Sequence, residues 1–242
     1  MAIYYLQFLW GLIAIPVLAY TVGTLTLKGL RFLTKTQGSR PDHLPELFFR
    51  LLLGTMVSIV LYALWKKGLN TIMSGFILTA VLGTIGYRWF NRRENESSKN
   101  INSFKLDKHS KFIIILFYFL YSAIYFLSSN NGHPVQPFTN INADHGFYAQ
   151  IGRNLSDGYS ENYFPTYTRL EPGKYENTMY HYLEAWGSAL ISELTGFPAF
   201  AALEIFYRAW FLFLALIGLV SLTQFYTNKN INLIQLVFLG AL

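Results

Sequence analysis

Long apolar runs separated by short polar stretches dominate the chain. A helix needs about 20 apolar residues to cross roughly 30 Å of hydrocarbon. The last apolar run of the sequence, 231–242, is too short to cross, because it would reach only about 18 Å at 1.5 Å per residue. We expect it to be a re-entrant segment or, as we favour, the start of a span in a chain that continues beyond it. The pattern predicts an all-α, polytopic membrane protein with five to six transmembrane helices. The charge-poor runs near spanning length are 3–27, 47–65, 69–87, 112–127 and 200–226.

The polar region 128–199 is predicted to fold, because structureless connections of that length are uncommon and its aromatic content argues against disorder. Two segments in it have helical periodicity with one apolar face, and Gly196 and Pro198 form a stop signal after the second. We expect two amphipathic helices that lie at the membrane interface. The apolar faces are Phe147, Tyr148, Ile151 and Leu155 in 145–155, and Tyr182, Leu183, Trp186, Leu190 and Leu194 in 181–196.

The distribution of Lys and Arg predicts the orientation of the spans, because cytoplasmic loops carry an excess of bases. Four bases lie in loop 28–46 and seven in loop 88–111. Both loops are cytoplasmic if the N-terminus is outside. The N-terminus and loop 128–199 are then extracytoplasmic, and we expect an integral protein of the plasma (inner) membrane. We divide the chain into an N-terminal three-helix region, 1–111, and a second region, 112–242.

Composition narrows the possible functions. Charged residues make up 13% of the chain, about half of the roughly 25% that soluble domains carry. The chain has no cysteine, which excludes disulfides and cysteine-based metal sites. The net charge of +6 is explained by membrane topology, and no nucleotide-binding motif is present. We therefore expect membrane lipid, and no nucleic acid, as a partner.

Asp144 and His145 stand at the start of the first predicted outer helix. Asp144 is either an ordinary N-cap or a catalytic or metal-binding carboxylate at the outer membrane surface. His145 is a candidate ligand or proton shuttle, although an isolated histidine is more often neither. His181 and Glu184 lie three apart on a helix and so are neighbours on its surface. The four residues together could hold a divalent metal ion, provided that the fold brings them together.

Three basic residues are candidates for binding a phosphate. Glu204 and Arg208 have the i,i+4 order of a helical ion pair. Such a pair could simply anchor the helix at the interface, or Arg208 could bind an anionic head group, because ionisable residues in membrane segments are often functional. Arg169 and Lys174 are candidates for the same task, although a solvated loop surface is the plainer role for each.

Two stretches resemble the GT-C superfamily of integral-membrane glycosyltransferases. "NADHGFYAQIGRNLSDG" is similar to the family's acid–x–x–x–Tyr stretch, and "MYHYLEAWGSALISELTGFPAFAALEIFYRAW" is similar to a Tyr-rich surface helix leading to a span with an arginine. The resemblance covers about residues 112–226. It departs from the family in three respects: three spans precede the outer loop, His145 stands where many members have a second acid, and the family fold has more spans.

The resemblance implies inverting transfer of a sugar from a polyprenyl-phosphate-linked donor in the cell envelope. Asp144 would be the general base or a metal ligand, and Arg208, with Arg169 or Lys174, would neutralise the leaving phosphate. A polymerase or ligase of lipid-linked glycans is an alternative enzyme. A transporter or a non-catalytic scaffold is an alternative of another class, although a transporter would tend to show internal repeats and polar residues near the membrane midplane.

Overall fold

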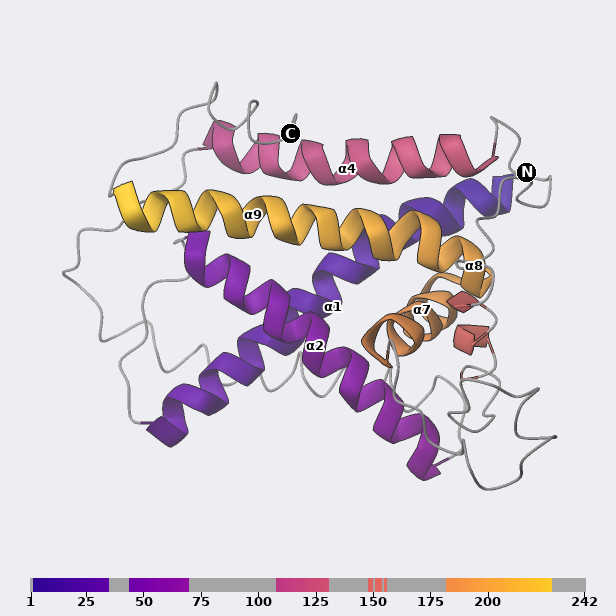
Figure 1. Cartoon of the computed structure of the whole chain (residues 1–242), viewed down its shortest axis with the longest axis horizontal. Helices are drawn as coiled ribbons and strands as arrows, with labels where there is room; N and C mark the ends of the chain where they lie inside the picture. The colour runs from indigo at the N-terminus through magenta and orange to yellow at the C-terminus, as the bar shows by residue number, and fades with distance from the viewer. Residues whose placement is uncertain are drawn as a thin grey trace. The chain divides into compact units, whose positions relative to one another are not determined.

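The computed structural model describes residues 2–34, 44–69, 108–130, 148–149, 151–153, 155 and 182–227. Nearly all of these residues are helical, and none of them lies in a strand (Figure 1). The all-α prediction is therefore confirmed for this part of the chain. The elements are α1 (Ala2–Thr34), α2 (Leu44–Leu69), α4 (Lys108–Asn130), α7 (Tyr182–Thr195), α8 (Ala199–Ala201), the π-helix η1 (Ala202–Tyr207) and α9 (Arg208–Thr227).

Three of the described helical segments are long and apolar enough to cross a membrane: Tyr5–Arg31, Leu44–Lys66 and Ala199–Thr223. They coincide with three of the expected spans and point to a membrane-embedded protein. The expected span at 112–127 falls within α4, whose apolar part, Ile114–Leu127, is shorter. Nearly all of the expected span at 69–87 and the whole run 231–242 lie outside the described residues, so the total number of spans stays a prediction.

Apolar side chains cover the outward face of α1 as well as its packed face. Phe8, Leu12 and Ile15 are buried, whereas Leu6 and Ile13 are more than half exposed. A helix that is apolar on all sides has to be buried in protein or in a membrane. The exposed leucines and isoleucines of α1 are therefore suited to contact with lipid.

The chain divides into two compact units. Unit 1 comprises 1–15, 59–75 and 122–209, and unit 2 comprises 16–58, 76–121 and 210–242. The predicted division into 1–111 and 112–242 stays a prediction, because residues 70–107 lie outside the described part of the chain.

In unit 1, the N-terminal part of α1 packs against the end of α7 and against η1. The Trp10 indole N–H donates to the carbonyl oxygen of Leu194 at 2.8 Å. Phe8 stacks on Phe126 of α4 with ring centroids 4.4 Å apart, and it also contacts Phe206. Aromatic contacts of this kind add to the free energy gained by burial alone.

In unit 2, α1 and α2 approach each other closely enough for their backbones to touch. A Cβ atom placed on Gly54 would overlap the carbonyl oxygen of Ala19, and one placed on Gly23 would overlap that of Arg50. Small residues are common at such crossings because they let membrane helices come close together. Both glycines are therefore required by packing.

We expect Gly54→Ala to destabilise the protein, because the added methyl group meets a backbone carbonyl that cannot move aside. Overpacking of this kind costs about 1–3 kcal/mol. Gly29→Ala is the matched control, since a Cβ there has nothing within 4 Å and alanine favours the helix by roughly 1 kcal/mol. Thermal unfolding in mild detergent, followed by circular dichroism, measures both. Equal melting temperatures for the two variants would contradict the close approach.

Candidate functional site

The described residues include two of the seven predicted site residues, Glu184 and Arg208, and both lie in unit 1. Whether Asp144 caps its helix or faces a cavity therefore stays open. The grouping of four metal ligands also stays a prediction. The site residues outside the described part are Asp144, His145, Arg169, Lys174 and His181.

Helix α7 forms where the periodicity predicted it, and it ends as predicted at Gly196. Gly196 has a φ of 74°, a left-handed conformation that glycine adopts at no steric cost. Its N–H donates to the carbonyl oxygen of Ser192 at 2.9 Å. The Thr195 hydroxyl donates to the carbonyl oxygen of Ile191 and accepts from the Phe197 N–H. These bonds satisfy groups that a helix end otherwise leaves without partners.

The surroundings of α7 differ from those of a helix lying on a membrane surface. Every residue from 185 to 191 is buried. Trp186, expected at the lipid interface, is only 2% exposed and packs edge-on against Tyr62 of α2. The polar residue Ser188 is also fully buried. Protein covers this part of α7 on all sides, so the periodicity identified the apolar face correctly but not what lies against it.

The first predicted outer helix packs directly on α7. The described residues of 148–155 are helical, with Ile151 and Leu155 of the expected apolar face buried and Tyr148 half-buried. A Cβ atom on Gly152 would overlap the Ser188 hydroxyl and crowd the carbonyl oxygen of Ala185. The absence of a side chain at Gly152 thus brings two segments together that are about 35 residues apart in the sequence.

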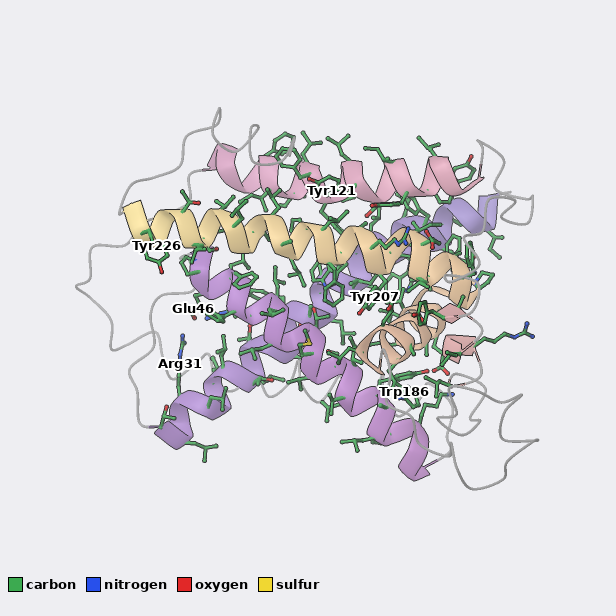
Figure 2. All side chains as sticks on the ribbon, viewed as in Figure 1. Arg31, Glu46, Tyr121, Trp186, Tyr207 and Tyr226 are labelled. Carbon is green, nitrogen blue, oxygen red and sulfur yellow. The ribbon has the colours of Figure 1, made fainter. Side chains whose placement is uncertain are left out.

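Glu184 lies on α7, one turn before the position where Tyr207 of η1 packs on this helix. The two side chains interact electrostatically. The Tyr207 ring also covers Gly187 so closely that a Cβ atom there would overlap it. Figure 2 labels Tyr207 and Trp186. One face of α7 therefore supports the residue that immediately precedes Arg208.

Arg208 forms the predicted ion pair with Glu204. The Arg208 Nη1 to Glu204 Oε2 distance is 2.8 Å, and the Arg208 side chain is 35% exposed whereas that of Glu204 is 11% exposed. Glu204 belongs to η1, a π-helix. Such helices are rare in proteins, and where they occur they are often found at functional sites. Arg208 follows immediately, at the first residue of α9. The guanidinium is thus oriented by a largely buried carboxylate while part of it remains accessible.

A second ion pair joins α2 to α7. Lys66 Nζ lies 2.5 Å from Glu193 Oε1, and the Tyr62 hydroxyl is close to the same carboxylate. Lys66 lies near the end of α2 and Glu193 near the end of α7. Nothing in the local spacing links two residues 127 positions apart, so this pair could not have been predicted.

Within the described residues, no three His, Cys, Asp or Glu side chains are grouped as metal ligands. Glu184 would need Asp144, His145 or His181 beside it to form such a site. All three lie outside the described part of the chain.

We expect Gly152→Ala to loosen the segment 148–155 from α7, because its new methyl group would occupy the position of the Ser188 hydroxyl. Hydrogen exchange followed by mass spectrometry should show faster exchange in peptides covering 148–155. Ser188→Gly removes the obstructing hydroxyl, so the double variant should regain protection relative to Gly152→Ala. The Ser188→Gly single variant is the control for the helix-weakening effect of glycine, roughly 1 kcal/mol. Unchanged exchange in Gly152→Ala would contradict the packing.

Comparison with protein-family models, with curated proteins and with solved structures found no match for this chain. The candidate site is therefore defined by its residues and their geometry. Its core in the described residues is α7, which carries Glu184 and packs against Tyr207, and Arg208, which is held by Glu204.

Proposed function

We propose that the chain belongs to a membrane glycosyltransferase. It transfers a sugar, with inversion, from a lipid-phosphate-linked donor at the outer face of the membrane. The observation that supports this most is the position of Arg208. Its guanidinium is partly exposed, oriented by Glu204, and located at the first residue of the long apolar helix α9. The apolar segment that contains it, Ala199–Thr223, is long enough to cross a membrane.

The donor explains why a phosphate site would be built at such a place. A lipid-linked sugar phosphate keeps its tail in the bilayer, so its phosphate stays close to the interface. Arginine binds phosphate well, because its planar group can donate two parallel hydrogen bonds. Five N–H donors make the ion pair with Glu204 compatible with a phosphate partner. Arg169 and Lys174 would add positive charge for the leaving group.

Asp144 would carry out the proton transfer. Its carboxylate would accept the proton from the acceptor hydroxyl or amine as the new bond to the sugar forms. The bond from the sugar to the phosphate breaks in the same step, and the phosphate leaves with the electron pair. Asp144 could instead hold a divalent metal ion, together with His145, His181 and Glu184.

The packing of unit 1 is compatible with this assignment. Asp144 is four residues before Tyr148, so the chain can separate their Cα atoms by at most about 14 Å. Gly152 of the same segment rests on Ser188 of α7, and α7 carries Glu184 beside Tyr207. Covalent linkage thus limits how far Asp144 can lie from the segment that packs on α7.

The proposed topology can be tested because the chain has no cysteine. We expect a single cysteine introduced by Asn154→Cys to react with a membrane-impermeant maleimide in intact cells. Asn100→Cys, in the basic loop 88–111, should react only after permeabilisation. Labelling of Asn100→Cys in intact cells, with labelling of Asn154→Cys only after permeabilisation, would show that the orientation in the membrane is the opposite of the proposed one.

The chemistry can be tested with a synthetic polyprenyl-phosphate-linked sugar and the full-length protein. Asp144→Asn should lower the transfer rate by at least about 100-fold, the usual contribution of a general base. Arg208→Gln should also impair transfer, whereas Arg208→Lys should retain part of it, because lysine supplies the charge without the planar fork. Arg153→Gln removes a charge from an exposed residue of the same unit and serves as the control.

Near-normal transfer by Asp144→Asn would reduce Asp144 to a helix cap. A wild-type protein that transfers no sugar from such donors would favour a transporter or scaffold. Transfer that joins lipid-linked glycans to each other, with no added acceptor, would favour a polymerase or ligase.

A further inference from the structure

A cluster of charged side chains lies in unit 2, where α1 ends and α2 begins. Glu46 of α2 is shared by two arginines: its Oε2 lies 2.9 Å from Arg31 Nη2, and its Oε1 accepts from both Nε and Nη2 of Arg50. The Glu46 side chain is only 4% exposed. Arg31 and Glu46 are labelled in Figure 2, where Arg31 extends from α1 toward Glu46.

Arg50 is fully engaged inside the protein. Besides the two bonds to Glu46, its Nη1 donates to the Thr24 hydroxyl at 3.2 Å, with the Tyr20 hydroxyl at 3.5 Å. The guanidinium also lies over the Tyr20 ring, 5.7 Å from its centroid. A buried charge is tolerated when it is paired and hydrogen-bonded in this way. Arg50 is therefore a structural residue that holds α1 and α2 together.

Arg31 is in a different situation. One ion pair to Glu46 occupies Nη2, out of the five N–H donors of an arginine, and 22% of its side chain is exposed. One carboxylate faces two guanidinium groups, so Arg31, Glu46 and Arg50 together carry a charge of +1. Because Arg50 is enclosed, Arg31 is the member of the cluster that presents this charge at the surface.

The neighbours of Arg31 are apolar and exposed. Leu30, which precedes it on α1, is 46% exposed, and Phe49 of α2, which precedes its cluster partner Arg50, is 53% exposed. The apolar segment of α1 that could span the membrane ends at Arg31 itself. An accessible arginine among exposed apolar side chains, at the end of such a segment, matches a molecule with a phosphate head and acyl chains.

We propose that Arg31, held by Glu46, binds the phosphate of an anionic phospholipid such as phosphatidylglycerol, whose acyl chains contact Leu30 and Phe49. The acyl contacts distinguish this ligand from free phosphate, which would gain nothing from exposed apolar side chains. The surplus charge of the cluster favours an anionic lipid over a zwitterionic one. The proposal does not rest on the proposed transfer reaction, because none of its residues belongs to the candidate site of unit 1.

The test is native mass spectrometry of the full chain in detergent, titrated with dioleoyl phosphatidylglycerol or with dioleoyl phosphatidylcholine. The wild-type protein should bind phosphatidylglycerol more tightly. Arg31→Gln should weaken that binding about fivefold, the change expected when one basic residue near the head group is lost, and leave phosphatidylcholine binding unchanged. Arg153→Gln, the same substitution at an exposed arginine of unit 1, should leave both affinities unchanged.

Three outcomes would overturn the proposal: equal affinities for the two lipids, an equal loss of phosphatidylglycerol in both glutamine variants, or displacement of the lipid by millimolar inorganic phosphate. Phosphatidylcholine binding and the elution volume on size exclusion report whether Arg31→Gln is folded. If it is not, Arg31→Lys decides the matter. It keeps the charge but loses the planar fork, so its preference for phosphatidylglycerol should be weaker than that of the wild type, and an undiminished preference would refute the assignment.

Discussion

The backbone contact between α1 and α2 determines how unit 2 is built. Gly23 and Gly54 remove the side chains that would hold the two helices apart. Arg50 lies one helical turn before Gly54, and its partner Thr24 directly follows Gly23. The guanidinium can therefore reach across to α1 without leaving the protein interior. Burying an arginine in a membrane segment is costly unless acceptors surround it, and the close approach supplies them from both helices.

In unit 1, glycines at other positions also allow close packing between segments. Gly152 lets one helical segment rest on Ser188, and Gly187 lets the Tyr207 ring lie against α7. The ion pair between Lys66 and Glu193 then joins α2 to the far end of α7. A helix buried by several neighbours in this way is a rigid support. Rigid support is what a binding residue such as Arg208 requires, because small displacements of charged groups weaken their interaction with a ligand.

Local features of the sequence were predictable, and features that join distant segments were not. The apolar runs correctly predicted three membrane-length helices, and Gly196 correctly predicted the end of α7. The spacing of Glu204 and Arg208 predicted their ion pair. Periodicity shows which face of a helix is apolar, but it does not show whether protein or lipid covers that face, so Trp186 was expected at the lipid interface. The grouping of Arg31, Glu46 and Arg50 depends on the crossing of α1 and α2, which sequence spacing does not encode. Glu184 and Arg208 were identified as site residues from the sequence, whereas the role of Tyr207 between them became visible only through its contact with α7.

The π-helix before Arg208 places one residue more in that stretch than an α-helix would hold. Each residue of an α-helix turns the chain by about 100°. The extra residue therefore determines the direction in which the side chains of the residues after η1 point. The orientation of Arg208 is therefore set by the number of residues in η1 as well as by their identity. Loss of a single residue there would leave all the other side chains chemically intact and still turn the arginine to another face of the helix. This stretch is consequently one in which length, more than composition, is constrained.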